Sequence, residues 1–262
     1  MNNLRGVYTI WYRDMLRFWH DKMRMVGSVT FPLLFLFVFG SGLSARMGFL
    51  GPGVDFTQFM FPGIIGMTVF MSSFMAGVSV VWDREFGFLK EVLVAPISRA
   101  SVAVGKTLGA ATVALLQGII ILFFAPLIGI SLSAWTVLAL LPLMFLLSAS
   151  MGSLGILLAT RIRSMEAFQA VMQMLMFPMV FLSGVFFPLQ GLPVWMNILV
   201  KINPATYGIA PIRQVMLGTS PDSPFAINLL GHTMSLWDNV TVIAAFGATM
   251  ILLAMWSFSS QE

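Results

Sequence analysis

Five long uncharged stretches constrain this chain more than any other feature of its sequence. They cover residues 25–45, 56–82, 107–160, 167–200 and 239–261. A helix needs about 20 apolar residues to cross the roughly 30 Å hydrocarbon core of a bilayer, where a charge is costly. Every stretch is long enough for such a crossing. The sequence therefore predicts an all-α integral membrane protein.

The lengths of these stretches set the number of spans. The 107–160 stretch is too long for one crossing, and residues 129–133 are polar enough to turn near its middle. Each of the other stretches holds one span. We expect six transmembrane helices, near residues 26–43, 59–82, 103–128, 135–159, 165–187 and 238–258.

Composition agrees with a membrane protein and limits its chemistry. The chain is 58% hydrophobic and only 9% charged, against roughly 25% charged residues in soluble domains. No segment is long and polar enough to fold as a separate soluble domain, so residues 1–262 are predicted to form one membrane domain. The chain has no cysteine, which excludes disulfides, thiol catalysis and thiolate metal sites.

Residues 1–25 are predicted to form an amphipathic helix at the membrane interface, with Asn3 as a cap at its start. A helix over residues 4–24 would separate an apolar face from the arginines. That face contains Leu4, Val7, Tyr8, Trp11, Met15, Phe18 and Trp19. Tryptophan suits the headgroup boundary, where its ring is buried and its N–H stays hydrated. This apolar face would pack either on the membrane surface or on a partner protein, and the sequence leaves both alternatives open.

The distribution of basic residues orients the chain. With the amino terminus inside the cell, 11 of the 14 lysines and arginines lie on the cytoplasmic side. The exceptions are Arg46, Lys201 and Arg213. Six spans then place both termini in the cytoplasm. Lys106 is interpreted as a basic anchor at the cytoplasmic end of the third span, and the net charge of +4 gives no argument for nucleic acid.

The predicted spans lack the groups that several function classes require. Ion-coupled carriers use ionisable side chains near the midplane of the membrane, and no such side chain is predicted there. Neither paired catalytic groups nor a histidine and carboxylate cluster is visible. We therefore assign no catalytic residue, no metal ligand and no cofactor to this chain. Energy for transport would have to come from a partner.

The segment between the second and third spans, residues 83–99, is the cytoplasmic loop best suited to receive that energy. It combines an apolar stripe with charges of both signs, and Pro96 ends the predicted helix. The stripe consists of Phe86, Leu89, Val92 and Leu93. Such a helix can dock in a groove of a partner. Packing of the stripe beneath the chain's own spans is the alternative, and the residues alone leave both open.

Two groups of motifs resemble the type 2 permeases of ATP-binding cassette (ABC) transporters. Residues 83–85, 89–91 and 95–99 resemble the coupling-helix region of that family. Residues 182–189 and 203–207, with Leu192, Pro193, Trp195 and Arg213 around them, resemble the end of its fifth span and the extracellular re-entrant helices that follow. The resemblance covers nearly the whole chain. Within that family, the chain resembles the permeases of drug, nodulation-factor and polysaccharide exporters.

The resemblance implies a permease subunit of an exporter in the inner (plasma) membrane, in contact with membrane lipid. Two copies, or this chain and a paralogue, would form the pore, and two cytosolic ABC ATPase subunits would bind ATP and Mg. Residues 83–100 would form the coupling-helix loop and 188–236 the extracellular re-entrant segment.

The resemblance also implies roles for individual residues. The residues implied to couple to the ATPase are Arg84, Glu85, Phe86, Gly87, Leu89, Lys90, Glu91 and Val92. Those implied to line the translocation path are Met67, Phe70, Phe74, Met172, Met176 and Phe177. Phe186, Phe187 and Pro188 would form an outer gate. Ordinary packing between spans is the alternative for the path residues.

The cargo is constrained only by the chemistry of the spans. Walls of Met and Phe without buried charge favour an apolar or amphipathic molecule, such as a drug or a lipid. A polysaccharide or glycolipid exporter is the alternative, although 24 Phe against 3 Tyr and 7 Trp weighs against it. A membrane scaffold without transport activity is a further alternative.

Overall fold

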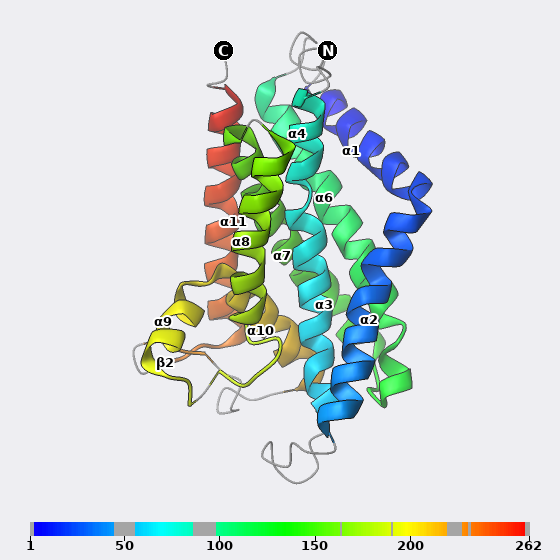
Figure 1. The fold of residues 1–262 in the computed structure, drawn as a ribbon, viewed down its shortest axis with the longest axis vertical. Helices are drawn as coiled ribbons and strands as arrows, with labels where there is room; N and C mark the ends of the chain where they lie inside the picture. The colour runs from blue at the N-terminus through cyan, green and yellow to red at the C-terminus, as the bar shows by residue number, and fades with distance from the viewer. Residues whose placement is uncertain are drawn as a thin grey trace.

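Long helices run side by side in this structure, and short elements close one end of the bundle (Figure 1). The computed structural model describes residues 3–44, 56–85, 98–162, 164–189, 191–218, 227–229 and 232–259. The six long helices that correspond to the predicted spans are α2 (Lys22–Ser44), α3 (Phe56–Phe74) with its continuation α4 (Gly77–Glu85), α6 (Arg99–Leu122), α7 (Ala134–Arg161), α8 (Met165–Phe181) and α11 (Leu236–Ser259). The other elements are α1 (Asn3–His20), the 3₁₀ helix η2 (Ala125–Ile128), α9 (Val194–Ile202), α10 (Pro204–Leu217) and the antiparallel pair β1 (Asn228–Leu229) and β2 (His232–Thr233).

Helices long and apolar enough to cross a membrane confirm a polytopic membrane protein. Four in the described part of the chain meet that test: the α3–α4 pair, α6, α7 and α11. The α1–α2 pair, bent by 68°, makes a fifth if it counts as one span. α8 is apolar but has 17 residues, fewer than the roughly 20 that a perpendicular crossing needs. The count of six spans stays a prediction.

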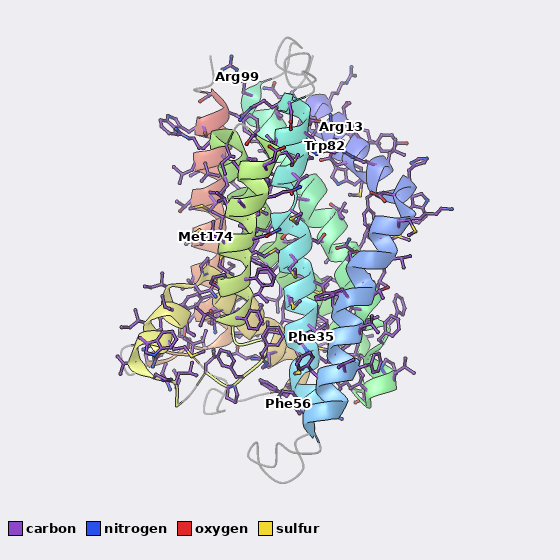
Figure 2. All side chains as sticks on the ribbon, in the orientation of Figure 1. Arg13, Phe35, Phe56, Trp82, Arg99 and Met174 are labelled. Carbon is purple, nitrogen blue, oxygen red and sulfur yellow. The ribbon has the colours of Figure 1, made fainter. Side chains whose placement is uncertain are left out.

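The described start and end of the chain lie at the same end of the bundle, which we call the terminal end. The Ser98 backbone N–H donates to the Asn3 side-chain oxygen over 3.4 Å, and Arg99 donates to the Ser259 carbonyl over 3.0 Å. Asn3 therefore joins α1 to the start of α6, and its role as a cap of α1 stays a prediction. Elements α9, α10 and β2 lie at the opposite end, which we call the far end (Figure 1). Figure 2 shows Arg13, Trp82 and Arg99 at the terminal end, and Phe35 and Phe56 toward the far end.

The second predicted span is present as α3 and its continuation α4, with an interruption inside it whose position the sequence did not indicate. A turn at Met75 and Ala76 separates α3 from α4. One turn earlier, the Ser73 hydroxyl donates to the carbonyls of Val69 and Phe70 over 2.8 and 3.0 Å. Such bonds from a serine back to its own helix often bend it. Gly77 follows the turn and lies directly against the Gly155 carbonyl of α7.

Two other helices end earlier than expected. α8 ends at Phe181 and not at 187, because the chain turns through Gly184, whose φ of +79° favours glycine. α6 ends at Leu122 and not at 128, where η2 with Pro126 takes over. The predicted turn at residues 129–133 is confirmed, since Gly129 has a φ of +77° and Ser133 caps the start of α7.

Helix α7 is the centre of the bundle, in contact with α3, α4, α6, α8, α10 and α11. Small residues permit these close approaches. Gly152 lies beside Ala110 of α6 and the Ser73 carbonyl, and Gly155 beside the Phe74 carbonyl. Buried α7 serines bond across the interfaces, as Ser150 does to the Ile243 carbonyl of α11 over 3.1 Å.

We predict that Gly155→Ala destabilises the fold, because a methyl group there would overlap the Phe74 backbone carbonyl. Overpacking of this kind costs about 1–3 kcal/mol, and backbone atoms have little room to yield. Gly42→Ala in α2, where nothing lies within 4 Å of an added Cβ, is the matched control. Thermal unfolding in detergent should show a lower midpoint for Gly155→Ala alone. Equal midpoints for both variants would contradict the close α3–α7 contact.

Candidate functional site

The segment predicted to receive the ATPase begins at the end of α4, and its described part is Asp83, Arg84 and Glu85. Phe86, Gly87, Leu89, Lys90, Glu91 and Val92 lie outside the described residues. Glu85 is exposed at the last position of α4. Ser98 and Arg99 resume the chain at the start of α6. The site is therefore built from the two anchors of the segment and from what they contact.

Arg84 attaches the first anchor to α7. Its guanidinium donates to the carbonyls of Ala159, Thr160 and Ile162 over 3.2, 3.1 and 2.9 Å. The last carbonyls of a helix have no partner within the helix and form its negative end. A single arginine therefore closes the end of α7 and fixes α4 beside it.

The second anchor joins three elements. The Ser98 hydroxyl caps α6 by accepting from the Ser101 N–H over 3.2 Å. The backbone N–H of Ser98 donates to the Asn3 side chain of α1, and the guanidinium of Arg99 donates to the Ser259 carbonyl at the end of α11. Displacement of the segment between the two anchors would therefore act on α1, α6, α7 and α11.

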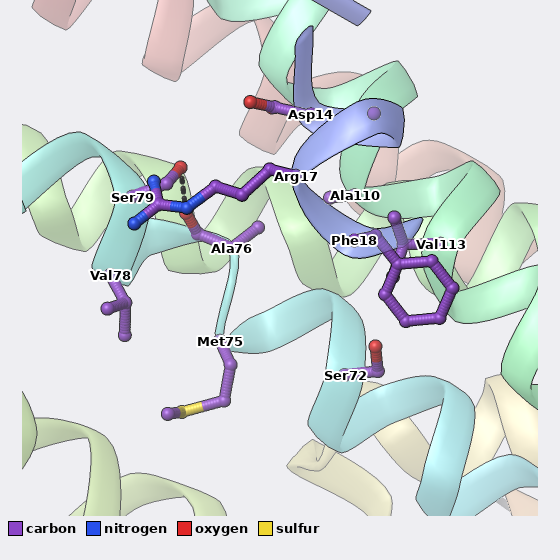
Figure 3. Close-up of a pocket in the computed structure, with 11 residues that line it drawn as sticks. Asp14, Arg17, Phe18, Ser72, Met75, Ala76, Val78, Ser79, Ala110 and Val113 are labelled. Carbon is purple, nitrogen blue, oxygen red and sulfur yellow. Dashed lines mark hydrogen bonds between the residues drawn. The ribbon is translucent and has the colours of Figure 1, made fainter. Parts of the chain in front are cut away.

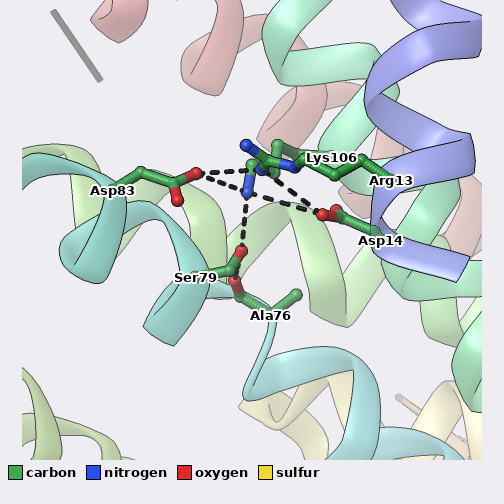
Figure 4. A network of polar contacts seen from close by, with 6 residues as sticks. All are labelled: Arg13, Asp14, Ala76, Ser79, Asp83 and Lys106. Atoms are coloured by element: carbon green, nitrogen blue, oxygen red, sulfur yellow. Dashed lines mark hydrogen bonds and ion pairs between the residues drawn. The ribbon is translucent and has the colours of Figure 1, made fainter. Parts of the chain in front are cut away.

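Beside the first anchor lies a set of four charged residues, Arg13, Asp14, Asp83 and Lys106, which we call the charge cluster (Figure 4). The Lys106 ammonium lies 2.8 Å from an Asp83 carboxylate oxygen and 3.7 Å from Asp14. It also donates to the Ser79 hydroxyl over 2.9 Å. Arg13 completes the cluster, 3.0 Å from Asp83 and 3.4 Å from Asp14. The cluster joins α1, α4 and α6.

Burial distinguishes this cluster from a surface ion pair. Lys106 is only 3% exposed. A buried charge is tolerated when it is paired and hydrogen-bonded, and removing one partner costs far more than losing a surface pair. Lys106 is therefore a buried member of an ion-pair cluster, which corrects the expectation of a simple basic anchor at the cytoplasmic end of the third span. The sequence contains a signal for this pairing that the sequence analysis did not use: the opposite charges of Asp83 and Lys106 near the same ends of two neighbouring predicted spans.

Helix α1 packs on α6 through the pair of glycines Gly105 and Gly109. An added Cβ at Gly105 would lie 3.0 Å from Ile10, and one at Gly109 would lie 3.0 Å from Asp14. A small-residue pair of this kind permits close helix contact. It brings Arg13 and Asp14 within reach of Lys106.

The predicted apolar face of α1 is only partly buried. Gly6, Ile10 and Phe18 face the bundle, whereas Leu4 and Trp19 are 79% and 70% exposed. The helix ends at His20, and Asp21 separates it from α2, so the expected helix over 4–24 is broken near its end. The exposed apolar residues are free to meet the headgroup region of a membrane, as an interfacial helix does.

A small pocket lies between α1, α6 and the α3–α4 turn (Figure 3). Arg17 extends across it toward Ala76 and Ser79, as Figure 3 shows, and its guanidinium lies 5.4 Å from the centre of the Trp82 ring. Arginine over tryptophan is a favourable cation–π pair. The charge of Arg17 therefore lies beside the α3–α4 turn.

The six residues predicted to line a path differ in exposure. Met67, Phe70, Phe74, Met172 and Met176 are buried in this chain, and Phe70 stacks on Phe74 at 5.4 Å. Phe177 is 56% exposed on α8. The structure thus brings the α3 members together in the core and leaves Phe177 facing outward. A path-lining role stays a prediction for all six.

The predicted outer gate lies in the bend after α8, next to a second buried cation. Phe186 packs on Phe35 of α2 and on Phe181, with ring centres 5.1 and 4.9 Å apart, and Phe187 and Pro188 are half-buried. Arg213 of α10 donates to the Gly184 carbonyl over 2.6 Å and lies 4.4 Å above the Phe59 ring.

Arg213 is a basic residue of the far end that is packed inside the chain. Burial lowers the pKa of its guanidinium to about 10, which still leaves it charged at neutral pH. Because it contacts both α3 and the bend after α8, Arg213 fixes the position of the predicted gate residues in this structure.

Comparisons with known proteins identify the family. The family model described as ABC-2 type transporter matches residues 5–217. A protein of Cyanophora paradoxa named as transport permease ycf38 is 32% identical, over 80% of this chain and 73% of its own length. Nodulation protein J of Rhizobium leguminosarum bv. viciae is 27% identical, over 80% and 81%.

The name of a bacterial relative states a membrane location for that protein. The Inner membrane transport permease YadH of Escherichia coli K12 is 28% identical, over 80% of this chain and 82% of its own. Residues 5–217, which the family model matches, include Arg84, Ser98 and Arg99 of the two anchors, the charge cluster and the bend after α8. The chain belongs to the ABC-2 type transporter family.

Proposed function

We propose that this chain is the permease subunit of an exporter that moves an amphipathic or hydrophobic molecule out across the inner membrane. A separate ATPase subunit binds ATP and Mg and supplies the energy. Two ATPase subunits and a second permease, identical or paralogous, complete the complex. The family assignment and the apolar helices support the permease role.

The observation that carries the coupling proposal is the double anchoring of residues 86–97. Arg84 holds one side against the end of α7, and Ser98 and Arg99 hold the other against α1 and α11. Force applied to the segment by an ATPase would reach the spans through these few polar contacts. Arg84 is therefore a structural member of the coupling set, while exposed Glu85 is suited to contact the ATPase.

The proposed orientation follows from the positions of the basic residues. Described cations gather at the terminal end, among them Arg13 and Arg99, whereas Lys201 and Arg213 belong to α9 and α10. An excess of Lys and Arg is typical of the cytoplasmic side. The terminal end would thus face the cytoplasm and the ATPase.

We predict that Glu85→Ala lowers cargo-stimulated ATP hydrolysis several-fold without changing the amount of folded permease. The reason is that Glu85 is exposed beside the proposed docking segment and its removal leaves the core contacts intact. Phe86→Ala should act in the same way. Glu166→Ala, another exposed carboxylate at the start of α8, is the matched control. The assay is vanadate-sensitive ATP hydrolysis by the purified complex in nanodiscs, and normal stimulation in both test variants would refute coupling through this segment.

We predict that Asp83→Asn destabilises the permease, because it leaves the buried Lys106 without its nearest carboxylate. Breaking a buried ion pair on one side costs about 3–5 kcal/mol, whereas removing both charges costs much less. The double variant Asp83→Asn with Lys106→Met should therefore unfold at a higher temperature than Asp83→Asn alone. Thermal unfolding of the detergent-solubilised protein tests this order. A double variant less stable than both single variants would contradict a coupled pair.

A further inference from the structure

An apolar groove between α2, the α3–α4 turn and α6 has the properties of a ligand site. Its volume is about 430 Å³, within the range of roughly 300–1,000 Å³ that small-molecule sites occupy. The walls are mainly Phe31, Pro32, Met71, Met75 and Val78, and Gln117 of α6 also lines the space. We call this space the α2–α6 groove.

Gln117 is the feature that ordinary packing does not account for. Its side chain is 2% exposed, and its amide nitrogen donates to the Ser28 hydroxyl over 2.9 Å. Within the described part of the chain, its amide oxygen has no hydrogen-bond donor. A buried polar atom without a partner costs about 1–3 kcal/mol. An acceptor held at this cost in an apolar groove indicates a ligand with a hydroxyl or N–H donor.

The groove continues toward a positive charge. It shares Ser72, Met75 and Val78 with the pocket of Figure 3, which Arg17 crosses. Along α6 the two spaces extend from Gly109 to Gln117, about 12 Å at 1.5 Å per residue. A ligand could therefore lie along α6 with one end near Arg17 and the other among apolar side chains.

The charges around Arg17 favour an anionic end. The two carboxylates of the charge cluster are already paired with Lys106 and Arg13. Arg17 adds a third cation beside those two carboxylates, so the pocket and cluster together carry a net charge of +1. An anionic group is the complement of this excess charge.

We propose that the α2–α6 groove binds a single-chain anionic amphiphile of the lysophospholipid class. Its phosphate lies at Arg17, its glycerol hydroxyl donates to the Gln117 amide oxygen, and its acyl chain lies along Phe31, Pro32 and Met71. This inference rests on the proposed function, whose cargo it names. Binding needs only the permease, so it is measured without ATPase, and failure of ATPase coupling would leave the binding result unaffected.

The test uses the full chain in detergent or nanodiscs and a palmitoyl lysophosphatidic acid with a photoactivatable diazirine in its chain. Gln117→Leu should weaken labelling affinity about ten-fold, the effect of one lost hydrogen bond to a buried acceptor. Met71→Trp, which fills the groove, should abolish saturable labelling. Arg17→Gln should weaken the anionic probe several-fold and leave uncharged diazirine-labelled monopalmitoylglycerol unchanged.

Matched controls keep the result interpretable. Gln214→Leu removes another amide oxygen without a donor in the described structure, from α10 outside the groove, and Met174→Trp adds a ring to an exposed position of α8. Both should label like the unmodified protein. Gln117→Leu should also unfold at an equal or higher temperature, since Ser28 keeps its bond to the Met25 carbonyl and an unpartnered acceptor is removed. Unchanged affinity in Gln117→Leu and Met71→Trp, with the peptide that crosslinks lying elsewhere, would overturn the proposal.

Discussion

The pairing of Lys106 with Asp83 is the interaction on which the terminal end of this permease depends. An ammonium group that is almost fully buried needs a carboxylate close by, and Asp83 provides it at 2.8 Å. That requirement fixes α4 against α6 and, through Arg13 and Asp14, fixes α1 as well. Arg84 is the residue after Asp83, so the same constraint positions its guanidinium at the end of α7. The segment proposed to couple to the ATPase thus starts from a point defined by two adjacent residues of α4.

Each end of the bundle contains a buried cation, and the two cations have different kinds of partner. At the terminal end the cation is neutralised by carboxylates from two other helices. At the far end Arg213 donates to a carbonyl and lies over an aromatic face, both of which are neutral partners. The first arrangement joins helices that are distant in sequence, and the second holds the bend after α8 in place.

Much of this architecture could be predicted from the sequence, for reasons that individual residues make clear. Long apolar stretches located all six of the helices expected as spans, and Ser133 and Gly129 marked the turn before α7 because their preferences are local. The partners of Lys106 were missed, since its role depends on Asp83 and Asp14, which lie on other helices. The interruption of α3 at Met75 was missed as well, because it depends on the approach of Gly77 to α7. Met67, Phe70 and Phe74 were chosen as path residues by analogy, and burial in the folded chain was not visible in their pattern.

The contact of Gly77 with Gly155 has a mechanical consequence for coupling. Backbone meets backbone there, so α4 cannot move toward α7 and cannot separate from it without losing the contact. The turn at Met75 and Ala76 lies immediately before this contact. α4 is therefore a rod about 13 Å long that is held at Gly77 by this contact and near its other end by Asp83 and Arg84. A push at Glu85 would therefore be passed to α6 and α7 through those bonds, and it would also reach the α2–α6 groove, which is lined by residues on both sides of Gly77.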